Sequence, residues 1–224
     1  MQFARDGRVV TASLDDHART WKTPDLAPDL DVRVGVPDGE LSVAMSPDAT
    51  LLVAGTEVSS LAVWDTAKRD WRARATMPNA GPVWKIVFAP DGALAFSATD
   101  DGLVRIWNTT TWADPIALDA GEGPALALAI SPDGARLAAG YASGAIVLWN
   151  VATRDVGMRI GGRTRERGSC AQLDTLAWVD SAHREIVEEA CRADATTYAT
   201  GLGARTKQRI DGEIDVTWDW IPPP

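Results

Sequence analysis

Apolar and polar residues alternate along this chain in short runs of strand length. Residues 41–45, 83–88 and 125–130 are three such runs, each ahead of a turn signal. A second run follows the turn, as at 136–139, and a third ends on a tryptophan, as at 103–107. Pro, Gly, Asp and Ser separate the runs, and no stretch keeps a helical period long enough to compete. The pattern predicts an all-β protein of short antiparallel strands.

Two markers recur along the chain with the same period. The first is a tryptophan, at Trp21, Trp64, Trp107 and Trp149, with gaps of 43, 43 and 42 residues. The second is a turn whose Asp precedes that tryptophan by 15 or 16 residues. The turns are Arg5-Asp6-Gly7, Pro47-Asp48-Ala49, Pro90-Asp91-Gly92 and Pro132-Asp133-Gly134. Self-similarity at about 40–45 residues around such a tryptophan is typical of propeller blades.

The third repeat carries a resemblance to a known family. Residues 81–92 and 97–108 closely resemble a bacterial-type WD40 repeat. The repeats at 131–150, 46–65 and 3–22 match progressively less well, so the resemblance covers about 1–150. It implies a β-propeller of four-stranded antiparallel blades, in which each repeat tryptophan is a structural residue packed between strands.

The resemblance also implies where the blades lie. The expected blades are 1–38, 39–80, 81–122, 123–165 and a degenerate fifth at 169–212, followed by a terminal strand at 213–222. The fourth strands of the first and third blades are expected at 31–34 and 115–118. In the fifth blade, 173–179 and 184–191 read as the first two strands, and Thr200 stands where the tryptophan is expected.

The two ends of the chain look complementary. Residues 214–222 match another first strand, while residues 1–3 match only the end of one. The terminal strand could complete the first blade and close a ring of about five blades, which would remove exposed edges. The other interpretation is a fragment of a propeller with more blades, because the family usually has seven. Both interpretations stay open at this stage.

The family's usual hydrogen-bond set, from an Asp through a His to the tryptophan, is incomplete here. Asp15 and Asp101 occupy the Asp position, but Val58 and Ser143 replace it in the second and fourth repeats. The His position is empty in every repeat. The sequence therefore predicts blades held by sheet hydrogen bonding and apolar packing, without that buried polar network.

Charge and composition narrow the function classes. The net charge of −9 argues against nucleic acid as a partner, because such a chain repels phosphate. No apolar run approaches the roughly 18 residues of a membrane span, and the first residues lack an apolar leader, so a cytoplasmic location is expected. Cys170 and Cys191 are too few for a disulfide scaffold or a zinc site, and we expect free thiols.

Nothing in the sequence resembles a nucleophile elbow, a phosphate-binding loop or a metal-binding helix, so we expect no enzyme, no cofactor and no metal. The possible interaction residues are Trp84, Asp100, Arg163 and Arg165. Trp84 lies next to the core-facing Val83 on a first strand, near the top of the propeller, where family members often bind partners. The two arginines belong to a basic cluster for which a solvated connection between blades is the favoured alternative.

Trp71 and Trp112 lie beside the outer strands and are either interface anchors or blade packing. The function expected from these features is a protein-interaction scaffold. Two alternatives stay open: a truncated remnant of a larger WD40 protein, and a propeller that senses a small molecule. A sensor needs converging polar side chains, whereas the first strands here are mostly apolar.

Overall fold

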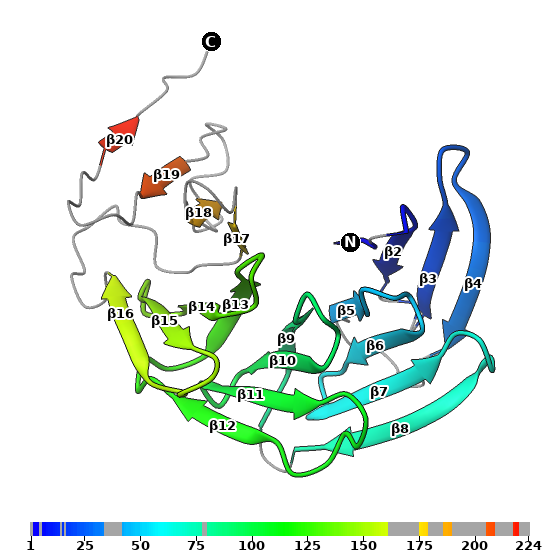
Figure 1. Ribbon diagram of the computed structural model, residues 1–224, viewed down its shortest axis with the longest axis horizontal. Coiled ribbons are helices and arrows are strands. Elements are labelled where there is room, and N and C mark those ends of the chain that lie inside the picture. The colour runs from blue at the N-terminus through cyan, green and yellow to red at the C-terminus, as the bar shows by residue number, and fades with distance from the viewer. Residues whose placement is uncertain are drawn as a thin grey trace. The chain divides into compact units, whose positions relative to one another are not determined.

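The computed structural model describes residues 2–4, 6–13, 15, 17–33, 42–77 and 80–160, and beyond these only the backbone of four short strands. The described residues form twenty β-strands, arranged as five four-stranded sheets (Figure 1). No helix that could cross a membrane occurs among them. The fold is all-β, as the alternating runs predict.

Each sheet is built from four consecutive strands. The first sheet contains β1 (Gln2–Phe3), β2 (Val9–Ala12), β3 (His17–Lys22) and β4 (Ala27–Arg33). The second contains β5 (Ser42–Met45), β6 (Leu51–Gly55), β7 (Ser60–Asp65) and β8 (Asp70–Thr76). The third contains β9 (Val83–Phe88), β10 (Leu94–Thr99), β11 (Leu103–Asn108) and β12 (Ile116–Asp119). The fourth contains β13 (Ala125–Ile130), β14 (Arg136–Tyr141), β15 (Ile146–Asn150) and β16 (Val156–Ile160). The fifth contains β17 (Thr175–Trp178), β18 (Ile186–Glu189), β19 (Arg205–Gln208) and β20 (Thr217–Asp219).

Within every sheet the strands pair in chain order, each antiparallel to the one before. This meander is the strand arrangement that the WD40 resemblance implies for a blade. The Asp-containing turns join first strands to second strands, and the repeat tryptophans lie on third strands. In the first, second and fourth sheets the pairing of the third and fourth strands shifts register at Trp21, Trp64 and Trp149. A β-bulge increases the local twist of a strand pair, and in these three sheets such an irregularity lies at the tryptophan.

The chain divides into two compact units, Met1–Asp119 and Ala120–Pro224. In the first unit, the second sheet contributes to two apolar cores through opposite faces of the same strand. Leu52 and Ala54 of β6 pack with residues of the first sheet, whereas Leu51 and Val53 pack with residues of the third. Successive side chains of a strand point to opposite faces, so the uninterrupted apolar run of β6 is what a strand buried on both sides requires.

In the second unit, the fourth sheet has its own apolar cluster. Ala127, Ala129 and Ala138 are buried there with Ile146 and Leu148. Three of these five residues are alanines, whose side chains keep this part of the sheet thin and leave the larger aliphatic residues of β15 to fill the volume. Met158 and Ile160 of the outer strand cover the cluster from one side.

The fifth sheet differs from the sequence expectation at two of its strands. The first two strands lie inside the segments expected for them, at 175–178 and 186–189. The third strand is Arg205–Gln208 rather than a run ending near Thr200. The terminal segment supplies β20, which pairs with β19 as the fourth strand of this sheet, instead of acting as a first strand. With no tryptophan to mark the third strand, the register of this repeat could not be read from the sequence.

Candidate functional site

The four repeat tryptophans lie on third strands with different degrees of burial. Trp107 and Trp149 are buried, and Trp21 and Trp64 are half-buried. Trp64 packs against the core shared by the first and second sheets, and Trp107 belongs to the core shared by the second and third. These side chains occupy the space between sheets, which is the position that a structural role requires.

The indole N–H groups of two repeat tryptophans have hydroxyl partners on the neighbouring strand. Trp107 Nε1 donates to Ser97 Oγ at 2.9 Å, and Trp21 Nε1 donates to Thr11 Oγ1 at 2.9 Å. In both sheets the hydroxyl residue stands two positions after the residue that pairs with the tryptophan. Side chains two apart share a face of the strand, so the hydroxyl lies on the indole side.

The same position is occupied by alanine in the other two repeats. Trp64 pairs with Leu52 and Trp149 with Leu137, which puts Ala54 and Ala139 where a hydroxyl would be needed. Neither indole N–H has a hydrogen-bond partner among the described residues, although both are buried. A buried unpaired donor costs free energy, so the indole N–H groups of the second and fourth repeats contribute less to stability than those of the first and third.

The Asp of the turn between the second and third strands is paired with an arginine, a polar contact different from the family's set of Asp, His and tryptophan. Asp101 accepts hydrogen bonds from Thr99 Oγ1 at 2.7 Å, from the Leu103 amide at 3.1 Å and from Arg105 Nη2 at 2.5 Å. Arg105 is buried. Burial acts to raise the pKa of Asp101, but the hydrogen bonds from Arg105, Thr99 and Leu103 outweigh it and hold the pKa below its ordinary value.

The first sheet repeats this arrangement closer to solvent. Arg19 Nη2 donates to Asp15 Oδ2 at 2.7 Å, and this hydrogen bond is the main reason that the pKa of Asp15 is lowered to about 2. Both pairs have the spacing Asp-x-x-x-Arg across the turn. Where the Asp is replaced, the arginine is replaced as well, by Ala62 in the second repeat and Val147 in the fourth. This spacing is the signal that would have revealed the pairs from the sequence.

In the fourth sheet, the turn between the second and third strands is hydrogen-bonded to the connection that precedes the sheet. Here the turn residue is the donor, whereas Asp101 and Asp15 are acceptors. Ser143, at the Asp position, donates through Oγ to Glu122 Oε2 at 3.0 Å. Arg159 Nη1 of the outer strand donates to the other oxygen of that carboxylate at 2.9 Å. Glu122 stands next to Gly121, which aligns with the family's His position. The link was missed because a Glu with a Ser partner does not resemble a His with an Asp partner.

The structure brings two of the predicted interaction residues together at one end of the third sheet. Trp84 Nε1 donates to Asp100 Oδ1 at 3.1 Å. The backbone fixes both ends of this contact, because the amides of Asp100 and Asp101 donate to the carbonyls of Pro82 and Ala80 at 3.1 and 3.0 Å. The connection ahead of β9 and the turn after β10 therefore form one rigid edge.

Gly81 allows this edge to close. Its φ is +69°, and a Cβ built there would lie 2.8 Å from the Cβ of Asp100. A larger residue would be strained and would push the two segments apart. The space that Gly81 leaves is what lets Asp100 reach the indole of Trp84.

The edge presents an aromatic ring and a carboxylate next to each other. Trp84 is half-buried and Asp100 is exposed, so an apolar surface and a carboxylate are presented side by side. Asp100 Oδ2 makes no hydrogen bond with the described part of the chain and can accept one from a ligand. The next residue, Lys85, is half-buried, and burial lowers its pKa. The described residues include no group of three or more His, Cys, Asp or Glu side chains that could hold a metal.

The other predicted interaction residues fall elsewhere. Arg163 and Arg165 lie outside the described residues, as do both cysteines. Trp112 is buried in the core of the second and third sheets, at 6.2 Å from the ring of Phe88, so it is packing rather than surface. Trp71 is 40% exposed on β8, and its ring meets the repeat Trp64 edge to face at 5.0 Å between centroids.

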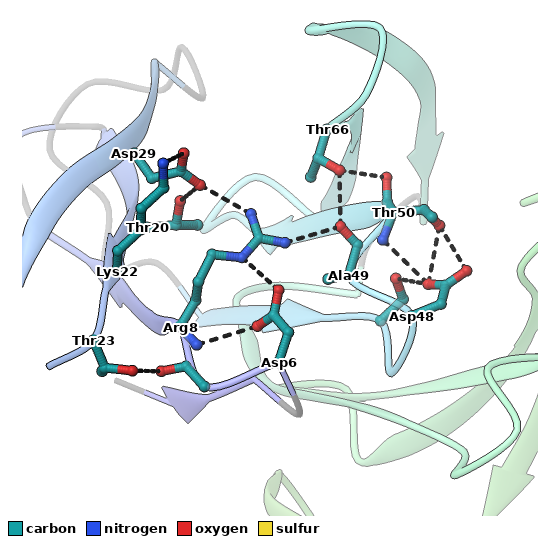
Figure 2. Close-up of polar contacts among 12 residues, drawn as sticks. Asp6, Arg8, Thr20, Lys22, Thr23, Asp29, Asp48, Ala49, Thr50 and Thr66 are labelled. Atoms are coloured by element: carbon teal, nitrogen blue, oxygen red, sulfur yellow. Dashed lines mark hydrogen bonds and ion pairs between the residues drawn. The ribbon is translucent and has the colours of Figure 1, made fainter.

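A polar cluster centred on Arg8 joins residues of the first sheet to Ala49 of the second (Figure 2). The guanidinium donates to Asp6 Oδ2 at 2.7 Å, to Asp29 Oδ2 at 3.0 Å and to the carbonyl of Ala49 in the second sheet at 3.3 Å. Burial acts to raise the pKa of Asp29, but hydrogen bonds from Arg8 and Lys22 leave it below its ordinary value. Because the Arg8 guanidinium already donates to three acceptors within the protein, the cluster joins the first sheet to the second rather than offering a ligand site.

Comparison with known proteins identifies the repeats. Residues 72–108 and 118–150 match the family model WD40, the WD domain or G-beta repeat. Each matched stretch begins on the outer strand of one sheet and ends on the third strand of the next, so the sequence repeat is offset from the sheet by one strand. Such an offset ties successive sheets together through the chain itself.

A similar sequence occurs in a fly protein. Over 68 residues this chain is 34% identical to "Protein groucho" of Drosophila melanogaster. The aligned stretch covers 30% of this chain and 9% of the fly protein, so only a small fraction of that protein's length is matched.

Proposed function

This chain carries WD40 repeats, and from that premise we propose that it is a non-enzymatic scaffold that binds protein partners. WD40 repeats are of the protein-interaction type. The observation that carries the proposal is the edge of the third sheet, where the indole of Trp84 is held against Asp100. The proposed binding surface is this edge.

The geometry suits a protein partner for two reasons. Tryptophan is enriched among the residues that dominate binding energy at interfaces, since it buries a large area with few rotatable bonds. A side chain already fixed by a hydrogen bond loses less conformational freedom when a partner arrives. The exposed carboxylate beside it favours a partner that offers an N–H donor or a cation next to an apolar group.

The test compares the proteins that bind to the immobilised wild-type chain, from an extract of its own source cells, with those that bind to variants of this edge. We would immobilise the wild-type chain, Trp84→Ala, Asp100→Asn and the control Val156→Ala, and quantify retained proteins by mass spectrometry. Val156 is also an exposed apolar residue, but it lies on the outer strand of the fourth sheet. Circular dichroism would establish that the variants are folded.

We expect at least one protein to be retained by the wild type and by Val156→Ala, and to be depleted about tenfold or more with Trp84→Ala. A set of retained proteins that is the same for all four chains would overturn the assignment of this edge. The expected cytoplasmic location stays a prediction.

A further inference from the structure

The outer strand of the second sheet presents an open edge with an unusual set of side chains. β8 pairs with β7 on one side, and no strand among the described residues pairs with its other side (Figure 1). Its backbone groups on that side are therefore available for hydrogen bonding. At seven residues it is as long as any strand in the described part of the chain.

The side chains around this edge are basic although the protein is acidic. Residues 68–74 include four cationic residues and one acidic residue, within a chain of net charge −9. The cationic residues are Lys68, Arg69, Arg72 and Arg74, and all four are exposed. Lys68 lies 3.4 Å from Asp65 but keeps 77% of its side chain exposed, so that pair neutralises little of the local field.

An aromatic surface stands in the middle of these charges. The indole of Trp71 is 40% exposed and rests edge to face on Trp64. The guanidinium of Arg74 lies 5.9 Å from the centre of the Trp71 ring. An apolar contact surface and a positive charge are therefore held next to each other on one strand.

The outer strands of the first, third and fourth sheets lack this combination. β4 contains Pro28, which cannot donate to an added strand, together with Asp29 and Asp31. β12 carries no cationic residue. On β16 the guanidinium of Arg159 is already bound to Glu122.

We propose that β8 binds an acidic peptide segment, which adds to the second sheet as an extended strand. Its main chain pairs with the open edge of β8, its carboxylates lie near Arg72, and an apolar side chain packs on Trp71. The same four cations repel a second copy of β8, so charge excludes self-pairing and selects an acidic strand. This surface is separate from the Trp84 edge and does not depend on the proposal made for it.

The experiment measures binding of defined peptides to the full chain by fluorescence anisotropy. The probe is a fluorescein-labelled ten-residue peptide that alternates Glu and Val with a central Leu. The comparison peptides are its Lys-for-Glu counterpart and two derivatives that carry N-methyl groups on alternate amides, in one phase or the other. N-methylation removes main-chain donors but keeps every charge, so it separates strand pairing from charge attraction.

We expect the acidic peptide to bind at least about tenfold more tightly than the Lys peptide. The peptide methylated on one set of alternate amides should lose binding and the peptide methylated on the other set should keep it, because alternate amides of a strand face opposite sides. Arg72→Glu and Trp71→Ala should each weaken binding about tenfold. Arg154→Glu, the same charge change at an exposed residue between β15 and β16, should leave binding unchanged, as should Trp84→Ala.

Three results of the binding measurement would overturn the proposal. They are an equal loss of binding with both N-methylated peptides, binding of the Lys peptide as tight as that of the acidic peptide, and acidic-peptide binding that survives Arg72→Glu. Since Trp71 packs on Trp64, Trp71→Ala could also disturb the sheet, and Arg72→Glu at an exposed position is the variant that keeps the test independent of folding. A dimer in solution that Arg72→Glu abolishes would point to a second copy as the occupant and would equally reject the acidic peptide.

Discussion

The repeat tryptophans differ in what their indole N–H groups meet, and this difference gives a test at single residues. Ser97→Ala should leave the buried N–H of Trp107 unpaired and lower the free energy of unfolding by about 1–3 kcal/mol. Ala139→Ser should supply the hydroxyl that Trp149 lacks, and it should be neutral or stabilising although it buries a polar atom. Urea unfolding of both variants measures the effect. A loss of stability in Ala139→Ser equal to that of Ser97→Ala would contradict the assigned pairing.

The turn between the second and third strands gives another residue-scale prediction. Ser59 has a φ of +58° at the position where the third and fourth repeats have Gly102 and Gly144, with φ of +84° and +80°. Positive φ strains a residue that has a Cβ, and the Ser59 hydroxyl makes no hydrogen bond with the described part of the chain that a substitution would remove.

Ser59→Gly should therefore raise the free energy of unfolding by about 0.5 kcal/mol, and Gly144→Ser should lower it by about 1 kcal/mol. Both values come from the midpoint of urea unfolding. If the two substitutions shifted the midpoint in the same direction, strain at this turn position could not be the cause.

At the scale of the strand and its turn, the two Asp–Arg pairs should differ in strength. Arg105 and Asp101 keep only 11% and 22% of their side chains exposed, against 25% and 49% for Arg19 and Asp15. Removing Asp101 leaves a buried guanidinium without its main partner, so Asp101→Ala should cost about 2 kcal/mol. The exposed pair is screened by water, so Asp15→Ala should cost less than Asp101→Ala.

A double-mutant cycle of Asp101→Ala and Arg105→Ala measures the coupling directly. We expect the double variant to be more stable than the sum of the single losses predicts, by about 1 kcal/mol or more. The matching cycle at Asp15 and Arg19 is the control. Additive losses at Asp101 and Arg105 would mean that the hydrogen bonds between them contribute no net stability.

The sequence could predict the sheets because their determinants are local. Alternation specifies strands, the turn residues specify their ends, and the tryptophan period specifies which strand is third. The prediction lost accuracy at Arg205–Gln208, where no tryptophan marks the third strand. The pairing of Trp84 with Asp100 was harder to predict, because it joins a residue of β9 to one in the turn after β10, and the close approach of that turn depends on Gly81.

The polar ties were missed for a different reason. No histidine occupies the family's His position in this sequence. Arg105 and Glu122 instead form hydrogen bonds to the turn between the second and third strands, at Asp101 and Ser143. Arg8 is still harder to assign, since its three acceptors are Asp6, Asp29 and Ala49, which are far apart along the chain. Only the packed sheets bring them together.

At the scale of the whole molecule, the Asp carboxylates that are paired with arginines make the free energy of unfolding depend on pH. Asp29 and Asp101 have pKa values lowered in the folded state, and that of Asp15 is lowered to about 2. In the unfolded chain an Asp titrates near about 3.9, so between these values the unfolded state binds more protons than the folded state. The stabilising contribution is therefore complete above about pH 4 and is lost as the pH falls towards about 2.

The urea midpoint should accordingly stay level from about pH 7 to about pH 5 and fall below about pH 4. Asp29→Asn is the matched variant, because an amide keeps the shape of the side chain but cannot be protonated in this range. It should be less stable than the wild type at neutral pH, since Arg8 and Lys22 lose their charged partner. It should also lose less stability on acidification, so that the two curves converge at low pH. If the urea midpoints of the two proteins changed in parallel with pH, Asp29 would titrate alike in the folded and unfolded chains. The loss of stability in acid would then be caused by the other carboxylates.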